Sequence, residues 1–219
     1  NRIRETNQWK PAIQAYLDCT ALVDDLVGQI VGALEESPYA GNTIIVLWSD
    51  HGFQLGEKGR WGKYSLWERA TRVNLMWAVP EVTTPGTTSA KPVNLLDIYP
   101  TLASLTGCEP PEGQLEGKDL TPLMKDPEAD WDQTTLTVFG YKNYGLRSER
   151  YRYITYADGT EELYDHQSDC WEWQNLADYP EYAQTKQMMR QELPTHHEPD
   201  GVTYTPVGYK WGLPSKSKK

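Results

Sequence analysis

One stretch of this 219-residue chain indicates its fold class most clearly: Thr43-Ile44-Ile45-Val46-Leu47-Trp48, followed by Ser49-Asp50-His51-Gly52. The first six residues are a continuous β-prone run, which is typical of a strand buried on both faces of a parallel sheet. The residues after Trp48 should then form a loop at the carboxyl end of that strand. Open α/β sheets bind their ligands at such ends, so we expect a functional site in this loop.

Elements on both sides of that stretch support an α/β domain. From Pro11 to Glu36 the apolar residues recur at helical spacing, and Ser37-Pro38 ends the helix because a residue before proline disfavours the α conformation. A second buried strand is predicted from Val73 to Val79, and a helix from Asn94 to Thr106 with Gly107 just past its end. Helix, short turn and buried strand in succession predict the α/β class.

The composition changes after Gly107. Residues 108–133 are rich in Pro, Glu, Asp and Gly, which indicates a connection over the surface, and Asp158-Gly159 is a strong hairpin signal. We therefore divide the chain into part of an α/β domain, residues 1–130, and a small antiparallel-sheet subdomain with a tail, residues 131–219. The elements predicted in the second part are strands at Leu136–Tyr141, Tyr144–Tyr156 and Glu161–Tyr164 and a helix at Pro180–Leu193.

Two strands of the buried type do not complete a stable sheet, because each leaves unpaired edge groups. We expect partner strands from an N-terminal half outside this sequence or from a second copy of the chain. Asn1 is neither an initiator Met nor the start of a signal peptide, which also favours the interpretation of the sequence as a fragment.

The composition excludes several classes of protein. With 31 Asp and Glu against 21 Lys and Arg, the chain has no basic footprint for nucleic acid. The mean hydropathy of −0.68 and the shortness of every apolar run exclude a membrane span. No CxxC pair occurs among the three cysteines, so a cysteine zinc site is not expected, although one disulfide remains open.

The loop after the first predicted strand carries the candidate chemistry. Asp50 and His51 place a carboxylate and an imidazole side by side, and both groups coordinate cations. Lys63 supplies a compact positive charge that could neutralise an oxyanion, and Trp61 either lines a substrate pocket or packs. From these residues alone, an Asp that caps a turn beside a surface His explains the pair equally well.

The longer string from Ser49 to Tyr64, S-D-H-G-F-Q-L-G-E-K-G-R-W-G-K-Y, is more specific. It resembles the second signature region of the type I sulfatases of the alkaline phosphatase superfamily, with the iduronate-2-sulfatase-like and choline-sulfatase-like branches as the nearest. The runs Leu95–Leu102, Leu146–Tyr153 and Glu162–Asp165 resemble further family motifs in the same order, and the match spans residues 12–182. It implies the C-terminal part of an alkaline-phosphatase-like α/β sandwich, followed by a small antiparallel sheet with a C-terminal helix.

The resemblance also implies roles for the candidate residues. Asp50 and His51 match two calcium ligands, and Lys63 matches a lysine that contacts the sulfate group and assists catalysis. The family nucleophile is a formylglycine made within a C/S-x-P-S-R motif, which is expected in the N-terminal half. None of the cysteines of this chain lies in that motif, so we expect the chain alone to be inactive; they are Cys19, Cys108 and Cys170.

Several residues depart from the pattern or remain open. Lys58 stands where many relatives have His, and Asn74 where they often have Pro. Asp24-Asp25 reads as a solvent face of the first helix rather than as the missing ligands. Glu57 could act as a base or simply form a turn, and His196-His197 lies in an aperiodic tail where a metal role is not favoured.

Two further functions compete with a sulfatase. One is a phosphatase, or a phosphonate or phosphodiester hydrolase, of the same superfamily, which shares the Asp-His pair. The other is a non-catalytic, degenerate module, favoured by the absent nucleophile motif. By resemblance only, the substrate would be a sulfate ester such as a sulfated sugar, and the compartment periplasmic, secreted or lysosome-like.

Overall fold

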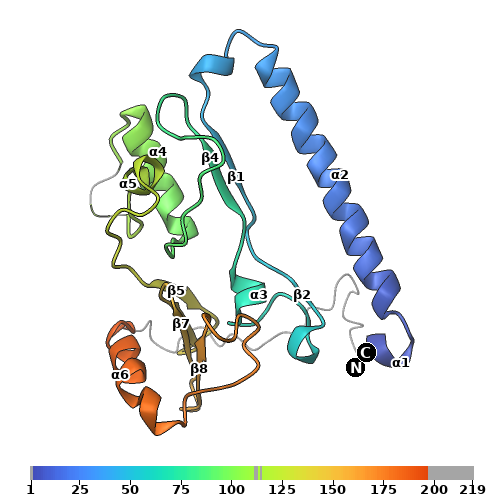
Figure 1. Cartoon of the computed structure of the whole chain (residues 1–219), viewed down its shortest axis with the longest axis vertical. Coiled ribbons are helices and arrows are strands. Elements are labelled where there is room, and N and C mark those ends of the chain that lie inside the picture. The colour runs from blue at the N-terminus through green and yellow to red at the C-terminus, as the bar shows by residue number, and fades with distance from the viewer. Residues whose placement is uncertain (1, 111–112, 114, 197–219) are drawn as a thin grey trace, which may run out of the picture.

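The computed structural model describes residues 2–110, 113 and 115–196 (Figure 1). A long helix stands on one side, a two-stranded antiparallel pair runs through the middle, and a four-stranded sheet with a short helix lies at the C-terminal end. His197 and the rest of the predicted tail lie outside the described residues. Within the described residues, no helix is both long and apolar enough to cross a membrane, and the three cysteines are free and exposed.

The N-terminal helix confirms its prediction. A single turn, α1 (Arg2–Glu5), precedes α2 (Trp9–Glu35), which begins two residues before the predicted Pro11. No residue of α2 is buried, and Figure 1 shows the helix standing apart from the sheets. Asp24 and Asp25 are exposed, as expected of a solvent face. Large apolar side chains of α2 are exposed as well; they are Tyr16, Leu17, Leu22, Val23, Leu26 and Ile30.

The two strands expected in a parallel sheet are antiparallel to each other. After a 3-10 turn, η1 (Ala40–Asn42), strand β1 (Ile45–Trp48) pairs with β4 (Leu75–Ala78) so that Trp48 lies opposite Leu75. The expectation of parallel strands buried on both faces is wrong here, since the side chains of both strands are half-buried or exposed. A parallel pair needs a crossover helix, and the segment between these strands forms only short elements.

The helix predicted for residues 94–106 is confirmed with a capping box at its start. It consists of η3 (Leu95–Asp97) and α4 (Ile98–Thr106). Asn94 Oδ1 accepts from Leu96 N at 3.1 Å, while Asp97 Oδ2 accepts from Asn94 N at 2.7 Å. Gly107 ends the helix with φ 71°, a left-handed conformation that favours glycine. The connection that follows contains a short helix that the sequence did not predict, α5 (Thr121–Lys125).

The C-terminal sheet is an antiparallel meander of four strands. The stretch Tyr144–Tyr156, predicted as one strand, forms two, because Ser148 turns the chain: its N–H donates to Tyr151 O at 2.9 Å. The turn at Asp158-Gly159 is confirmed, with Gly159 at φ 86°. The strands are β5 (Thr135–Val138), β6 (Tyr144–Arg147), β7 (Tyr151–Thr155) and β8 (Glu161–Asp165).

The best-packed part of the described chain lies on the two faces of this sheet. One face packs against η4 (Pro180–Tyr182) and α6 (Ala183–Gln191), through Tyr153 and Leu163 among others. On the other face, Leu66 packs with Ile154 and Tyr164. Leu66 lies two residues after the Ser49–Tyr64 string, so its packing anchors the end of the candidate loop to the C-terminal sheet.

Candidate active-site loop

The candidate residues lie on the segment between β1 and a one-turn helix, α3 (Glu68–Thr71). This segment contains a two-residue ladder, β2 (Gln54–Leu55) with β3 (Trp61–Gly62), around the 3-10 turn η2 (Glu57–Gly59). The prediction of a loop is therefore confirmed in outline, with a small hairpin inside it.

Gly52 holds the start of the loop against α3. Its N–H donates to Ala70 O at 2.9 Å. A Cβ at this position would lie 2.2 Å from Arg69 O and 2.7 Å from Arg72 O, so only glycine allows this approach. Ser49 also fixes the backbone at His51, because its Oγ donates to His51 O at 2.9 Å.

Asp50, His51 and Lys63 come together. Lys63 Nζ lies 2.7 Å from His51 Nε2, and His51 Nε2 lies 3.4 Å from Asp50 Oδ2. The Asp50 side chain is 80% exposed and that of His51 is 31% exposed. The three groups that the sequence singled out thus form one accessible cluster at the end of β1.

The hydrogen bonds of His51 assign its tautomer. Nδ1 lies 2.8 Å from Gly52 O, and a carbonyl oxygen only accepts, so Nδ1 carries the proton. Nε2 then offers a lone pair, which the Lys63 ammonium meets. This is the arrangement in which a histidine ligates a cation: one ring nitrogen is fixed by a carbonyl and the other faces the ligand.

Trp61 and Glu57 have structural contacts in this loop. The Trp61 ring packs edge-on against Trp9 of α2, with the ring centroids 5.1 Å apart. Glu57 Oε2 accepts from Leu55 N at 2.6 Å, which supports its turn-forming interpretation. Trp61 nevertheless lies two residues from Lys63, so its place in a substrate pocket stays a prediction.

Lys58 points away from the cluster and into the C-terminal sheet. Its Nζ donates to Tyr164 Oη at 2.8 Å and to Glu172 O. The ammonium also lies over the Trp67 and Tyr164 rings, 4.7 and 4.4 Å from their centroids. Burial lowers the pKa of Lys58, although Glu162 and Glu172 oppose that shift. Lys58 therefore ties the loop to the sheet.

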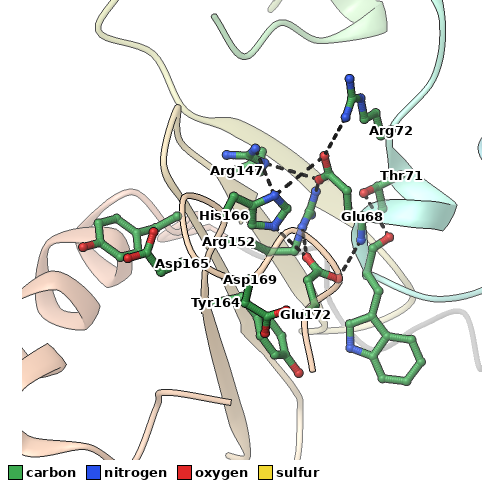
Figure 2. A network of polar contacts seen from close by, with 12 residues as sticks. Glu68, Thr71, Arg72, Arg147, Arg152, Tyr164, Asp165, His166, Asp169 and Glu172 are labelled. Carbon is green, nitrogen blue, oxygen red and sulfur yellow. Dashed lines mark hydrogen bonds and ion pairs between the residues drawn. The ribbon is translucent and has the colours of Figure 1, made fainter. Parts of the chain in front are cut away.

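A buried ion-pair network, which no sequence pattern predicted, lies where the loop joins α3 (Figure 2). Glu68 pairs with Arg152 and, at 3.3 Å, with Arg147 Nε. Glu172 Oε2 accepts from Glu68 N at 2.9 Å, and His166 Nε2 lies 3.0 Å from Glu172 Oε1. The partners are far apart in the sequence, so neither periodicity nor motif spacing could have joined them.

Charge balance makes this network structural rather than a metal centre. Ligand atoms of Glu68, His166 and Glu172 lie within 4.8 Å of one another, close enough to hold a metal ion. The guanidinium groups of Arg147 and Arg152 already balance the two carboxylates. Burial alone would raise the pKa of Glu68, but Arg152, followed by Arg147, lowers it to about 2.

One surface hollow among the described residues does not involve the candidate loop. It is lined by residues that follow β8, among them Asp169, Gln174 and Tyr182, and by none of the candidate loop. The Asp50 side chain is 80% exposed, so the candidate cluster lies at the surface of this chain. Its chemistry rests on the convergence of three side chains.

Comparisons with known proteins identify the family of the chain. A family model described as sulfatase matches residues 2–108, and one described as N-sulphoglucosamine sulphohydrolase, C-terminal, matches residues 56–198. The second match covers well over half of the chain. The chain belongs to the sulfatase family.

Two curated relatives illustrate the similarity of this sulfatase-family chain. A protein named sulfatase from Formosa agariphila is 43% identical over 86% of this chain and 37% of its own length. An N-acetylglucosamine-6-O-sulfatase from Bacteroides thetaiotaomicron is 28% identical over 85% of this chain and 36% of its own length. The chain therefore spans little more than a third of the length of these two relatives.

Solved structures confirm the alkaline-phosphatase-like α/β fold class. A protein in complex with its substrate D-glucosamine-2-N,6-O-disulfate has a TM-score of 0.71 at 29% identity, over 78% of this chain and 37% of the other. The phosphonate monoester hydrolase of Agrobacterium radiobacter has a TM-score of 0.67 at 25% identity, over 78% and 38%. The structures that this sulfatase-family chain resembles thus include one with a sulfated substrate and one that is a phosphonate hydrolase.

Proposed function

We propose that this chain is the C-terminal part of a sulfuric ester hydrolase. In this proposal Asp50 and His51 supply two calcium ligands and Lys63 binds the sulfate group. The observation that carries it is the contact of Lys63 Nζ with His51 Nε2 at 2.7 Å, beside the exposed carboxylate of Asp50. Membership of the sulfatase family supports it.

The donor set fits a cation. The carboxylate of Asp50 and the Nε2 lone pair of His51 converge, and Nε2 accepts a hydrogen bond from the Lys63 ammonium, which supports a place for positive charge here. Calcium prefers oxygen ligands, so the two residues would form only part of a complete site. When bound, calcium would polarise the sulfate oxygens.

Lys63 and its neighbours bind and orient the sulfate ester. The Lys63 ammonium stabilises negative charge on the sulfate as the S–O bond breaks. The bond of His51 to Gly52 O keeps the Nε2 lone pair aimed at the cluster, and Gly52 fixes the backbone beside it. These residues bind and orient the ester; they do not attack it.

The nucleophile is proposed to be a formylglycine in the N-terminal part of the enzyme. No cysteine of this chain stands in a C/S-x-P-S-R motif. Two calcium ligands and a lysine do not replace a covalent nucleophile, so we expect the chain by itself not to hydrolyse sulfate esters. The chain would act with an N-terminal half of the same enzyme.

We further propose a sulfated sugar as the substrate and the periplasm or the cell exterior as the compartment. The named substrates of the glucosamine-disulfate complex and of the N-acetylglucosamine-6-O-sulfatase support the first point. The placement near the iduronate-2-sulfatase-like and choline-sulfatase-like branches rests on the motif string of residues 49–64.

A phosphonate or phosphate ester hydrolase is the second candidate. The fold similarity to a phosphonate monoester hydrolase favours it. Lys63 within its G-E-K-G-x-W string favours sulfate, and turnover of matched sulfate and phosphate esters by the complete enzyme separates the two functions. A degenerate, non-catalytic module would leave the convergence of Asp50, His51 and Lys63 without a purpose.

Calcium binding by this chain tests the proposed half-site. Titration calorimetry should show that Asp50→Ala lowers the calcium affinity at least tenfold, because one of two ligands is lost. Asp24→Ala, which removes an exposed aspartate from α2, is the matched control and should bind like the wild type. Equal affinities for wild type and Asp50→Ala would contradict the assignment.

A further inference from the structure

We propose that Tyr64 and Phe139 form an aromatic shelf that holds the sugar ring of the sulfated substrate beside Lys63. This inference rests on the proposed function and adds the residues that would recognise the part of the substrate beyond its sulfate group. Neither residue was singled out by its sequence.

The shelf is continuous with the proposed sulfate site. Lys63 Nζ lies 5.8 Å from the centroid of the Tyr64 ring, and the Tyr64 and Phe139 centroids are 6.3 Å apart with an angle of 44° between the rings. In this proposal a sulfate group binds at Lys63 and the attached sugar extends over Tyr64 and Phe139.

Both rings remain open to solvent. Tyr64 is 58% exposed and Phe139 is 45% exposed, although they contact each other across the two parts of the chain. Grouped exposed aromatic residues of this kind mark binding surfaces more often than scattered single ones do.

Tyr64 has a strained backbone conformation where its side chain projects into solvent. Tyr64 has φ 27°, a value that a bulky residue rarely adopts. Arg60 Nη2 donates to Tyr64 O at 3.0 Å and holds the peptide in place. The ring gains little burial in return, so the strain serves the outward placement of the side chain; such strain gathers at binding sites.

Phe139 is presented by a tight turn between β5 and β6. Phe139 N donates to Asn143 O at 2.9 Å, while Asn143 Nδ2 donates to Phe139 O at 2.9 Å and to Tyr141 O at 3.1 Å. Ala157 N donates to Asn143 Oδ1 at 3.0 Å, which fixes the turn to the next loop of the sheet. These bonds fix the backbone from which the Phe139 ring projects.

A sugar is the occupant that this surface suits. An apolar aryl or sterol group gains most from an enclosed, largely apolar pocket, and the shelf is open and wet. A sugar ring has an apolar C–H face that packs on aromatic rings and a hydroxyl rim that stays in water. The ammonium of Lys63 at one end complements the negative charge of a sulfate substituent.

Binding of two probes by the chain tests the shelf. The probes are 6-O-sulfated N-acetylglucosamine and inorganic sulfate, titrated to millimolar concentration and followed by saturation-transfer NMR. Phe139→Ala should weaken binding of the sulfated sugar about three- to tenfold and leave inorganic sulfate unchanged. Phe139→Tyr should retain wild-type affinity because it keeps the ring. Trp173→Ala removes an aromatic side chain that is 63% exposed elsewhere, and it should bind both probes like the wild type.

The outcomes distinguish failure of the aromatic shelf from failure of the proposed sulfate site. If Lys63→Ala weakens both probes while Phe139→Ala weakens neither, the sulfate site stands and the shelf is wrong. If Lys63→Ala binds both probes like the wild type, the proposed function fails and the shelf fails with it. A wild-type chain that binds inorganic sulfate but no sulfated sugar also overturns the shelf.

Discussion

At the scale of single residues, two lysines of the candidate loop differ in the groups that they contact. Lys58 and Lys63 stand five positions apart in one loop, yet Lys63 faces His51 and Lys58 faces Tyr164. The two residues are of the same type, and the resemblance to the family implies a sulfate-binding role only for Lys63. The different roles follow from the hairpin that places the two side chains on different sides of the loop.

Gly52 gives a prediction at this scale. Gly52→Ala would place Cβ against the carbonyl oxygens of Arg69 and Arg72, so the loop must move away from α3. We expect the substitution to lower the free energy of unfolding by about 1–3 kcal/mol and to weaken calcium binding through His51. Gly41→Ala, where a Cβ would meet nothing within 4 Å, is the control and should be near wild type in urea unfolding. A Gly52→Ala chain as stable as this control would show that the close contact is not required.

At the scale of elements, the C-terminal sheet positions the candidate loop through buried charge. Glu172 adopts φ 59° and is 2% exposed, and its carboxylate caps the first N–H of α3 at Glu68. Lys58 makes a second link by donating to Tyr164 and to Glu172 O. A segment from one part of the chain is thus fixed by groups from the other.

Most of the helices and strands could be predicted from the sequence, and the predictions that failed have a common cause. The helix α2, the capped helix ending at Gly107 and the hairpin at Asp158-Gly159 depend on local signals, and they are confirmed. The antiparallel pairing of β1 with β4 and the pairing of Glu68 with Arg152 depend on contacts between distant residues. One sequence without its homologues contains no record of such contacts. The roles of Asp50, His51, Lys63 and Trp61 remain predictions.

The ion-pair network predicts an acid-dependent loss of stability. The folded-state pKa of Glu68, about 2, lies below its ordinary value of 4.5, so its contribution is present above pH 4.5 and is lost as the pH falls toward 2. That difference corresponds to about 3 kcal/mol. Glu161, whose pKa also falls to about 2 through Arg190 and its other partners despite burial, adds to the decline in the same window.

The Glu68→Gln variant measures how much the ion-pair network contributes to this loss of stability in acid. The variant should be less stable than the wild type at pH 7 and should lose a smaller amount between pH 4.5 and 2, measured by thermal unfolding across that range. Glu181→Gln changes an exposed carboxylate of η4 and serves as the control. An unchanged pH profile in Glu68→Gln would show that the buried pair does not govern acid stability.

At the scale of the whole molecule, the packing of the described chain is uneven. The C-terminal sheet has residues with 0–2% exposure on both faces, whereas α2 buries none and β1 pairs with a single strand. An amphipathic helix normally covers a core with its apolar side. The chain spans little more than a third of the length of the two relatives described above. We propose that the apolar side of α2 contacts further protein.

That surface predicts self-association of the chain when it is alone in solution. Exposed Leu22, Leu26 and Ile30 on α2 form an apolar row that water disfavours, and a second copy is the partner available. Sedimentation velocity should show dimers or larger species whose population rises with concentration. Leu26→Glu combined with Ile30→Glu should shift the chain toward monomer, because two charges would have to be buried in the contact. Met188→Glu, at a side chain 61% exposed on α6, is the control and should sediment like the wild type. If the wild-type chain is monomeric at every concentration, the apolar row of α2 does not hold two copies together, and its complement is to be sought in the N-terminal half of the proposed enzyme.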